Sequence, residues 1–420
     1  MSLLRIVRRL LGLGVKRPEP PTKPPITEAP VETPEPAPRK PERYFTLGID
    51  FGTHGTKIAY RASDGSFNDT KIITLEGSGT SDRHPNVFPS LVTVCNDRIY
   101  FGTPVNGGAV IENFKMGIGD NAVEPHSGLT YEDTSILFLA YVLCSAERII
   151  RSENPDYLCK TMLNLGAPFS QLQADEYGRD SYVRILRLIW RLYWHYASEV
   201  KQGIHLEEGR KLIAAAESNI ARGEEHWRWL VPEIQAVVTT FAQSADVPPL
   251  SYHLVVDVGG FTTDFSLFNV GNPINPIASI FASRVIRRAI IDYDQAQNGD
   301  EFCRAIRNEL IEAINNAHHE TLLEPFQFVN FDTKALWRIG GGYYRSDFLD
   351  RLLDSAAFLP GLQHLDRNPE FRGNVDRMFL VARGLATLHR NLIAIVQANP
   401  IQEFIPPPDE ELPYYLQGHN

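Results

Sequence analysis

Two stretches of the chain place carboxylates, glycines and hydroxyls at the point where an apolar strand ends. The first, FTLGIDFGTHGTKIAY at 45–60, predicts a buried strand ending at Asp50, a tight turn over Gly52 and Thr53, and a returning strand that begins at Thr56. Glycines let the backbone approach a ligand closely, and successive N–H groups with threonine hydroxyls can bind an anion. The stretch therefore predicts a phosphate-binding hairpin.

The second stretch, HLVVDVGGFTTDFSLF at 253–268, repeats this pattern. Its strand ends at Asp257, and its turn residues are Gly259, Gly260, Thr262 and Thr263. Two such hairpins could clamp the phosphates of one ligand from opposite sides. A carboxylate beside a phosphate is repulsive unless a divalent cation lies between them, so Asp50 and Asp257 predict an Mg²⁺ ion held largely through water.

The residue pattern from Tyr44 onward predicts that an α/β fold positions these hairpins. From Tyr44 onward, β-branched and aromatic runs alternate with turn residues and long helical stretches. From about 177 to 230 the pattern predicts a helical insertion, and 401–420 predict an acidic tail. Within the insertion, YVRILRLIWRLYWHY predicts an amphipathic core helix with a basic face formed by Arg184, Arg187 and Arg191.

The order of these motifs resembles that of the superfamily of actin, DnaK-type heat-shock chaperones and sugar kinases. Residues 45–60 are similar to its phosphate 1 motif, and 253–268 to phosphate 2 in the version of ParM-type bacterial filament proteins. Residues 231–245 resemble connect 1, LWRIGGGYYRSDFLDRLL at 336–353 resembles the adenosine motif, and 378–388 resembles connect 2 with close-packing alanines and a glycine. The resemblance implies a two-lobed actin-like ATPase fold made of duplicated ribonuclease-H-like domains, with ATP or ADP and Mg²⁺ as ligands. It places lobe I at 44–245, lobe II at 246–375 and a C-terminal helix that returns to lobe I at 376–400.

The resemblance also implies roles for single residues, with a water molecule attacking the γ-phosphoryl group of ATP. The implied catalytic residues are Asp50, Glu233, Gln235 and Asp257, of which Asp50 and Asp257 would orient hydrated Mg²⁺. The implied nucleotide-binding residues are Gly52, Thr53, Thr56, Lys57, Gly259, Gly260, Thr262, Thr263, Gly340, Gly341 and Gly342. The residue that orients the water stays open, because the match to actin selects Gln235 and the match to ParM-type proteins selects Glu233.

A further similarity to DnaK-type proteins includes one departure. Residues 84–119, which end in NFKMGIG, resemble the region of those proteins that reads as Pro-Ser, strand, Gly, then Phe-Lys. DnaK-type enzymes carry a catalytic lysine after the glycine that Gly102 matches, whereas this chain has Asn106 there. This departure argues against a DnaK-like catalytic step.

The N-terminal residues differ in composition from the rest. Residues 1–17 hold five basic residues, no acid and a helical spacing of leucines, which predicts a basic amphipathic helix for an anionic membrane surface or for docking on a partner protein. Ten of the 29 prolines follow within 18–43, which predicts an extended, disordered linker. No apolar run approaches the ~20 residues of a spanning helix. We therefore expect a cytoplasmic protein with peripheral attachment to the inner face of the membrane.

The net charge and the spacing of the cysteines argue against two classes of function, nucleic-acid binding and metal binding by cysteines. The net charge of −10 argues against nucleic-acid binding, and the spacing of Cys95, Cys144, Cys159 and Cys303 predicts reduced, buried thiols and no metal site. The resemblance favours a Mg-dependent ATPase that acts as a nucleotide-driven conformational switch and binds a protein partner or itself. The alternatives are an actin-like filament-forming cytoskeletal or segregation protein, a small-metabolite kinase, and a nucleotide-binding scaffold with little turnover.

Overall fold

The computed structural model describes 40–78, 84–169, 172, 176–218, 228–244, 252–270, 277–321, 335–339, 348, 351–352 and 376–397. The chain divides into two units, 1–40 and 41–420, and the fold below is that of the second. The amphipathic helix and most of the linker expected before residue 40 lie outside the described residues, as does the tail at 401–420. Within the described ranges, no helix has the length and apolarity needed to cross a bilayer.

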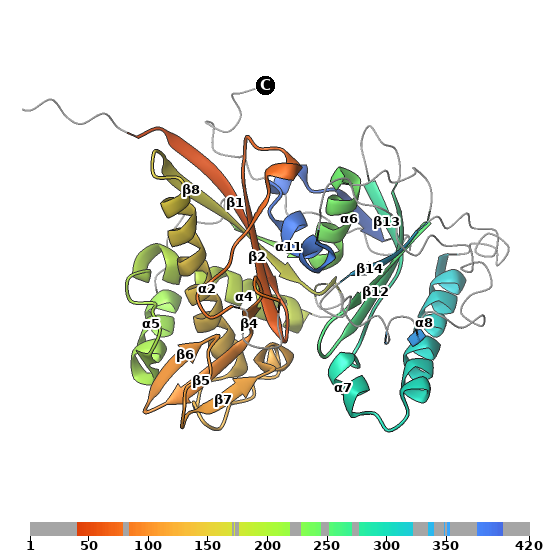
Figure 1. Cartoon of the computed structure of the whole chain (residues 1–420), viewed down its shortest axis with the longest axis horizontal. Coiled ribbons are helices and arrows are strands. Elements are labelled where there is room, and N and C mark those ends of the chain that lie inside the picture. The colour runs from red at the N-terminus through yellow and green to blue at the C-terminus, as the bar shows by residue number, and fades with distance from the viewer. Residues whose placement is uncertain are drawn as a thin grey trace, which may run out of the picture. The chain divides into compact units, whose positions relative to one another are not determined.

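The first large sheet contains the first predicted hairpin (Figure 1). Its strands run in the order β10-β8-β1-β2-β3, with β4 also paired to β2. The bounds are β1 Glu42–Phe51, β2 Gly55–Ala62, β3 Lys71–Ile72, β4 Phe88–Pro89, β8 Leu158–Ala167 and β10 Arg228–Pro232. Strand β2 is antiparallel to both β1 and β3, whereas β8 and β10 run parallel to β1. Because β1 begins at Glu42, the predicted linker boundary at residue 43 is two residues too late.

The second large sheet contains the second hairpin and repeats this arrangement. Its strand order is β14-β11-β12-β13-β15. The bounds are β11 Tyr252–Val258, β12 Thr263–Val270, β13 Ile277–Ile286, β14 Ala335–Ile339 and β15 Ala394–Gln397. Again the second strand in chain order, β12, is antiparallel to both β11 and β13, and the fourth, β14, runs parallel to β11. The two hairpins therefore occupy matching places in two sheets, and the prediction of a mixed α/β fold is confirmed.

The segment at 376–400 differs from the single helix predicted for it. It contains a 3-10 turn at Arg377–Phe379, the short helix α11 at Leu380–Leu385, a second 3-10 turn at His389–Asn391, and β15. Helix α11 packs on β1 and β2 of the first sheet, while β15 pairs in parallel with β13 of the second. The segment therefore contributes to both sheets. The strand β15 was not predicted, because a strand that pairs with a partner more than 100 residues away leaves no local signal in the sequence.

A third, smaller sheet and six further helices complete the described fold. The small sheet has the order β7-β5-β6-β9, with β5 Leu91–Cys95, β6 Arg98–Phe101, β7 Ala109–Glu112 and β9 Ile204–His205. The helices are α2 Tyr131–Glu153, α4 Glu176–Tyr196, α5 Leu206–Ser218, α6 Glu233–Ser244, α7 Ile290–Gln295 and α8 Gly299–Thr321. The predicted helical insertion at 177–230 thus contains α4 and α5, together with β9 and the start of β10. The four cysteines are free thiols, three of them buried and Cys95 partly exposed.

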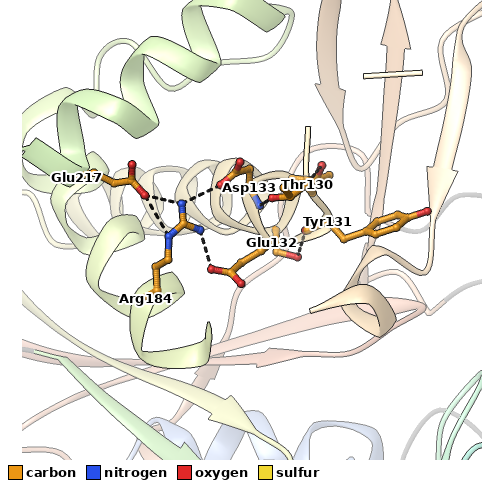
Figure 2. Close-up of polar contacts among 8 residues, drawn as sticks. Thr130, Tyr131, Glu132, Asp133, Arg184 and Glu217 are labelled. Atoms are coloured by element: carbon orange, nitrogen blue, oxygen red, sulfur yellow. Dashed lines mark hydrogen bonds and ion pairs between the residues drawn. The ribbon is translucent and has the colours of Figure 1, made fainter. Parts of the chain in front are cut away.

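Figure 2 shows how α2, α4 and α5 are joined by one arginine. The guanidinium of Arg184 on α4 donates to Oε1 of Glu132 at 2.6 Å and to Oδ1 of Asp133 at 3.0 Å, both on α2, and it also bonds Glu217 on α5. Arg191 on α4 is buried and donates to the Ala216 carbonyl. The predicted basic face is therefore solvated only in part, since these two arginines bind neighbouring helices.

Side chains alternate strictly across β1, and this alternation sorts the first sheet into two faces. Leu47, Ile49 and Phe51 point into the large core that contains α2. The opposite face carries three cross-strand pairs in register, which are Asp50 with Lys57, Gly48 with Ala59, and Thr46 with Arg61. Helix α11 lies on the middle pair, where a Cβ on Gly48 would be 2.6 Å from the Ala382 carbonyl oxygen.

Helices α6 and α11 cross at very close range. A Cβ on Gly384 of α11 would lie 1.9 Å from the carbonyl oxygen of Ala236 on α6, so only glycine allows this approach. Both helices contribute to one apolar cluster with β11, β12, β13 and β15 of the second sheet, while α8 covers its other face. The close packing expected of the 378–388 segment is thereby present, and it connects the two large sheets.

Candidate functional site

The first hairpin presents an ion pair at the end of its two strands. Asp50 of β1 lies opposite Lys57 of β2 in the ladder, and the Lys57 Nζ donates to the Asp50 Oδ2 at 2.8 Å. Both side chains are nearly buried, with an exposure of 6% for Asp50 and 13% for Lys57. The turn between them needs glycine at residue 52, because a Cβ there would lie 2.5 Å from the Gly55 carbonyl oxygen.

The second hairpin has the same ladder but a different charge. Asp257 of β11 lies opposite Asp264 of β12, so two carboxylates face each other where the first hairpin has an ion pair. The turn is closed by the Gly259 N–H, which donates to the Thr262 carbonyl at 2.8 Å. In the described part of the chain, Oδ1 of Asp264 is buried without a hydrogen-bond partner. Such an atom has a net affinity for a cation or a donor.

The two hairpins meet at their turns. The rings of His54 and Phe261, one from each turn, lie with their centroids 6.2 Å apart. A Cβ on Gly260 would be 2.9 Å from the Cβ of His54. Lys57 interacts electrostatically with Asp257 of the other hairpin as well as with Asp50 of its own. The charged ends of both hairpins therefore belong to one site.

A second ion pair enters the site from outside the hairpins. Glu233 is the first residue of α6, directly after β10, and its Oε1 accepts from the Lys115 Nζ at 3.2 Å. Lys115 comes from the 3-10 turn Phe114–Gly117, and its ammonium lies 5.6 Å from the ring centroid of Phe51, a cation–π contact. The turn residue Asn106 is exposed. Lys115 therefore brings a cation to Glu233, whereas Asn106 lies at the surface.

Burial shifts the protonation equilibria of the acids in this site. It raises the pKa of Asp257 to about 7 and the pKa of Asp264 well above its usual value. It also raises the pKa of Glu233, although the Lys115 ammonium partly opposes this. For Lys57 and Lys115, burial alone would lower the pKa, but the carboxylates of Asp50 and Glu233 more than offset it, so that both are raised.

The raised pKa of Asp257 gives a pH dependence of stability with a defined sign. Because the folded state binds this proton more tightly than the unfolded state, stability must fall as pH rises from about 4, the unfolded pKa, to about 7, the folded pKa. We therefore expect the free energy of unfolding, measured with denaturant in the presence of EDTA, to be lower at pH 8 than at pH 5.5. Asp257→Asn should flatten this dependence. An unchanged slope in the variant would contradict the assignment.

The structure places the side chains of Glu233 and Gln235, the two alternatives for orienting the water, in different surroundings. The side chain of Glu233 joins the charged cluster, whereas Nε2 of Gln235 donates to the carbonyl of Ile393 at 3.0 Å. Two residues along a helix point in different directions, and Gln235 anchors the segment that leads into β15. Its polar group is therefore used in the fold and not in the site.

Two of the predicted hydroxyl ligands are structural. Thr56 is fully buried, and its Oγ1 lies 2.9 Å from the Oγ of Ser90. Thr263 is 2% exposed and donates to the Arg288 carbonyl at 2.8 Å. Both hydroxyls are therefore bonded within the fold and are not presented to the charged site. Since each directly precedes a charged site residue on its strand, strand alternation turns it to the opposite face.

The remaining predicted residues are placed in part. Gly52, Thr53, Gly259, Gly260 and Thr262 form the two turns and are half-buried, while Gly340, Gly341 and Gly342 lie outside the described residues. The residues that the prediction missed are Asp264, Lys115 and Tyr182. Asp264 directly follows the Thr-Thr pair, and Lys115 belongs to the NFKMGIG stretch, so both carried a sequence signal. Tyr182 of α4, whose pKa burial raises to about 12, carried none.

The charges of the site do not balance. Four carboxylates (Asp50, Glu233, Asp257 and Asp264) and two ammonium groups (Lys57 and Lys115) leave two negative charges when all are ionised. Because burial raises the pKa of Asp257, Asp264 and Glu233, this full ionisation needs a counter-charge, which one divalent cation would supply. Among the described residues, no group of three or more His, Cys, Asp or Glu side chains is arranged to hold a metal ion by itself. The donor set therefore fits Mg²⁺, which retains waters and binds through one or two carboxylates together with phosphates.

Comparison with known proteins adds no relative. No protein-family model matches the chain, and no characterised protein matches its sequence. The function must therefore be argued from the site itself.

Proposed function

We propose that the chain is a Mg²⁺-dependent ATPase of the actin and DnaK type, in which the nucleotide phosphates bind between the two hairpins and drive a conformational switch. One observation carries the proposal. Asp50 and Asp257 end the first strands of two sheets with matching strand arrangements, and Lys57 interacts with both carboxylates. Duplicated sheets that aim equivalent acids at one point are what a two-lobed phosphate clamp requires. The adenine base is inferred only from the resemblance at 336–353.

Some residues of the site would bind the phosphates, and others would hold the hydrated Mg²⁺ ion in position. The turn backbones over Gly52–Thr53 and Gly259–Gly260 would approach the phosphates, and the Lys57 ammonium would supply a point charge to them. Asp50 and Asp257 would hold the hydrated Mg²⁺, whose contribution when bound is to neutralise charge on the phosphates. The unpartnered Oδ1 of Asp264 would accept from a water of that hydration shell.

Glu233 would orient the attacking water and accept its proton. Its raised pKa makes it a better base than an exposed glutamate, and Lys115 holds its carboxylate in place from a separate segment. Catalysis would then consist of positioning and charge neutralisation, as is general for phosphoryl transfer.

Asp257→Asn provides the test of Mg²⁺ and nucleotide binding. We expect the wild-type protein to bind Mg-ADP and Mg-ATP in calorimetry and to lose most of this affinity in EDTA. The variant should bind Mg-nucleotide at least about tenfold more weakly, since one charged ligand contact is worth about 1.5–3 kcal/mol.

Asp97→Asn is the matched control, because Asp97 is exposed and has a positive φ that asparagine also tolerates. It should leave binding unchanged. Nucleotide binding that is unchanged by EDTA and by Asp257→Asn would refute the proposal. ADP formation that strictly requires an added metabolite, without release of inorganic phosphate, would favour the kinase alternative.

A further inference from the structure

A polar cavity lies at the other end of the first hairpin from the charged site. It has a volume of about 310 Å³, and its lining includes Thr46, Arg61, Ser63, Gln243 and Asn391. Thr46 and Arg61 form a ladder pair four residues along β1 from Asp50, which is about 14 Å at 3.4 Å per residue. Its size is at the lower end of the range for small-molecule sites, ~300–1,000 Å³.

Arg61 is a buried cation without an acid. Its exposure is 7%, and burial lowers the pKa of its guanidinium to about 10. The described part of the chain gives it no salt bridge, only a long contact of 3.5 Å from its Nη1 to the Oε1 of Gln243 and a cation–π contact with Phe67. The nearest acid in electrostatic terms, Asp69, is held by the N–H and the hydroxyl of Ser66. A buried charge is costly unless it is paired.

The cavity also contains unused hydroxyl donors. Oγ1 of Thr46 and Oγ of Ser63 are buried, and neither has a hydrogen-bond partner in the part of the chain that the structure describes. Thr46 is only 1% exposed. The last turn of α6, which carries Gln243, attracts a cation through its carbonyl dipoles. This accounts for the position of Arg61 but leaves both hydroxyls unsatisfied.

A second cation reinforces the positive character of this region. The guanidinium of Arg383 on α11 lies 6.0 Å from the centroid of Phe67, the same ring that Arg61 contacts. Its Nε is buried without a partner among the described residues, and burial lowers its pKa despite the attraction of Asp376. Within the described ranges, two guanidinium groups that form no salt bridge therefore share one aromatic ring beside the cavity.

We propose that this cavity, the oxyanion pocket, binds the phosphate group of a small molecule. Arg61 offers a fork of N–H donors, and hydroxyl donors come from Thr46 of β1 and from Ser63 in the turn directly after β2. A planar carboxylate would be satisfied by the guanidinium fork alone, whereas a tetrahedral phosphate has enough acceptor oxygens for all three residues. The pocket is separate from the nucleotide site because Gly48 and Ala59, covered by α11, lie between them.

Thermal unfolding with inorganic phosphate tests the oxyanion pocket. We expect phosphate to raise the Tm of the full chain in a saturable way, and sodium chloride at equal ionic strength to have no such effect. Arg61→Met keeps the apolar stem and removes the charge, so the apparent phosphate affinity should fall at least about tenfold. Asp257→Asn, which alters only the nucleotide site, should keep the full response.

Ser63→Ala keeps the test decisive if Arg61→Met does not fold. Removing an unpartnered hydroxyl should leave the Tm without phosphate unchanged or higher, while the phosphate affinity falls severalfold. A merely unsatisfied hydroxyl would give the first result without the second. The proposal is overturned if wild type shows no response, if the response disappears in Asp257→Asn, or if it is equal in wild type and both pocket variants.

Discussion

Glu233→Gln is expected to lower the rate of ATP hydrolysis by about 10²- to 10⁴-fold, the range for loss of a general base. Glutamine keeps the size of the side chain and its bond from Lys115, but it cannot accept the proton of the attacking water. Because Glu233 is proposed to act on the water and not on the nucleotide, affinity for Mg-ATP should change by less than about threefold. Single-turnover phosphate release and calorimetric titration would measure the two quantities separately.

Gln235→Leu is the matched control from the same helical turn. It removes the hydrogen bond to the Ile393 carbonyl, so it should lower the free energy of unfolding by about 1 kcal/mol and leave the hydrolysis rate close to that of wild type. The reverse pattern, with a slow Gln235 variant and a normal Glu233 variant, would show that the water is oriented from the other side chain. A normal rate in both variants would remove α6 from the mechanism.

Gly384→Ala is expected to cost about 3 kcal/mol or more of folding stability, a large part of the ~5–15 kcal/mol that a domain possesses. The new Cβ would lie 1.9 Å from the carbonyl oxygen of Ala236. Since the obstacle is backbone, no rotamer change relieves it, and α6 and α11 must move apart. Equilibrium unfolding in urea would measure the loss.

Gly107→Ala serves as the control for the conformational cost of replacing a glycine. A Cβ at Gly107 meets no atom within 4 Å, although φ is +77°, so its expected cost is only about 1 kcal/mol. Equal destabilisation by the two substitutions would mean that the close approach of α6 and α11 contributes nothing. A difference of about 2 kcal/mol or more would establish it.

Local patterns explain what could be predicted from the sequence. The strand and turn residues around Asp50 and Asp257 are contiguous, so both hairpins and their turns were predictable. The period-2 alternation of strands was also available in the sequence, and it would have excluded Thr56 and Thr263 as phosphate ligands, because each neighbours a charged residue that must face the other way.

Long-range contacts explain what could not be predicted. The choice between Glu233 and Gln235 depends on Ile393, which is over 150 residues away, and the pairing of β15 with β13 joins residues more than 100 positions apart. Lys115 was visible as part of a motif, but its bond to Glu233 joins segments 118 residues apart. No periodicity or turn signal reports such contacts, since they arise only when the sheets are assembled.

The ladder of three pairs on β1 and β2 has a mechanical consequence. The charged pair Asp50–Lys57 and the pair Thr46–Arg61 lie at opposite ends of the same two strands. The Gly48–Ala59 pair, which α11 covers, lies between them. A ligand that changed the twist of these strands from one end through to the other would couple the two sites. Thermodynamic linkage then makes the effect mutual, so a phosphate compound at the far end would tune nucleotide affinity by the same factor by which nucleotide tunes its own.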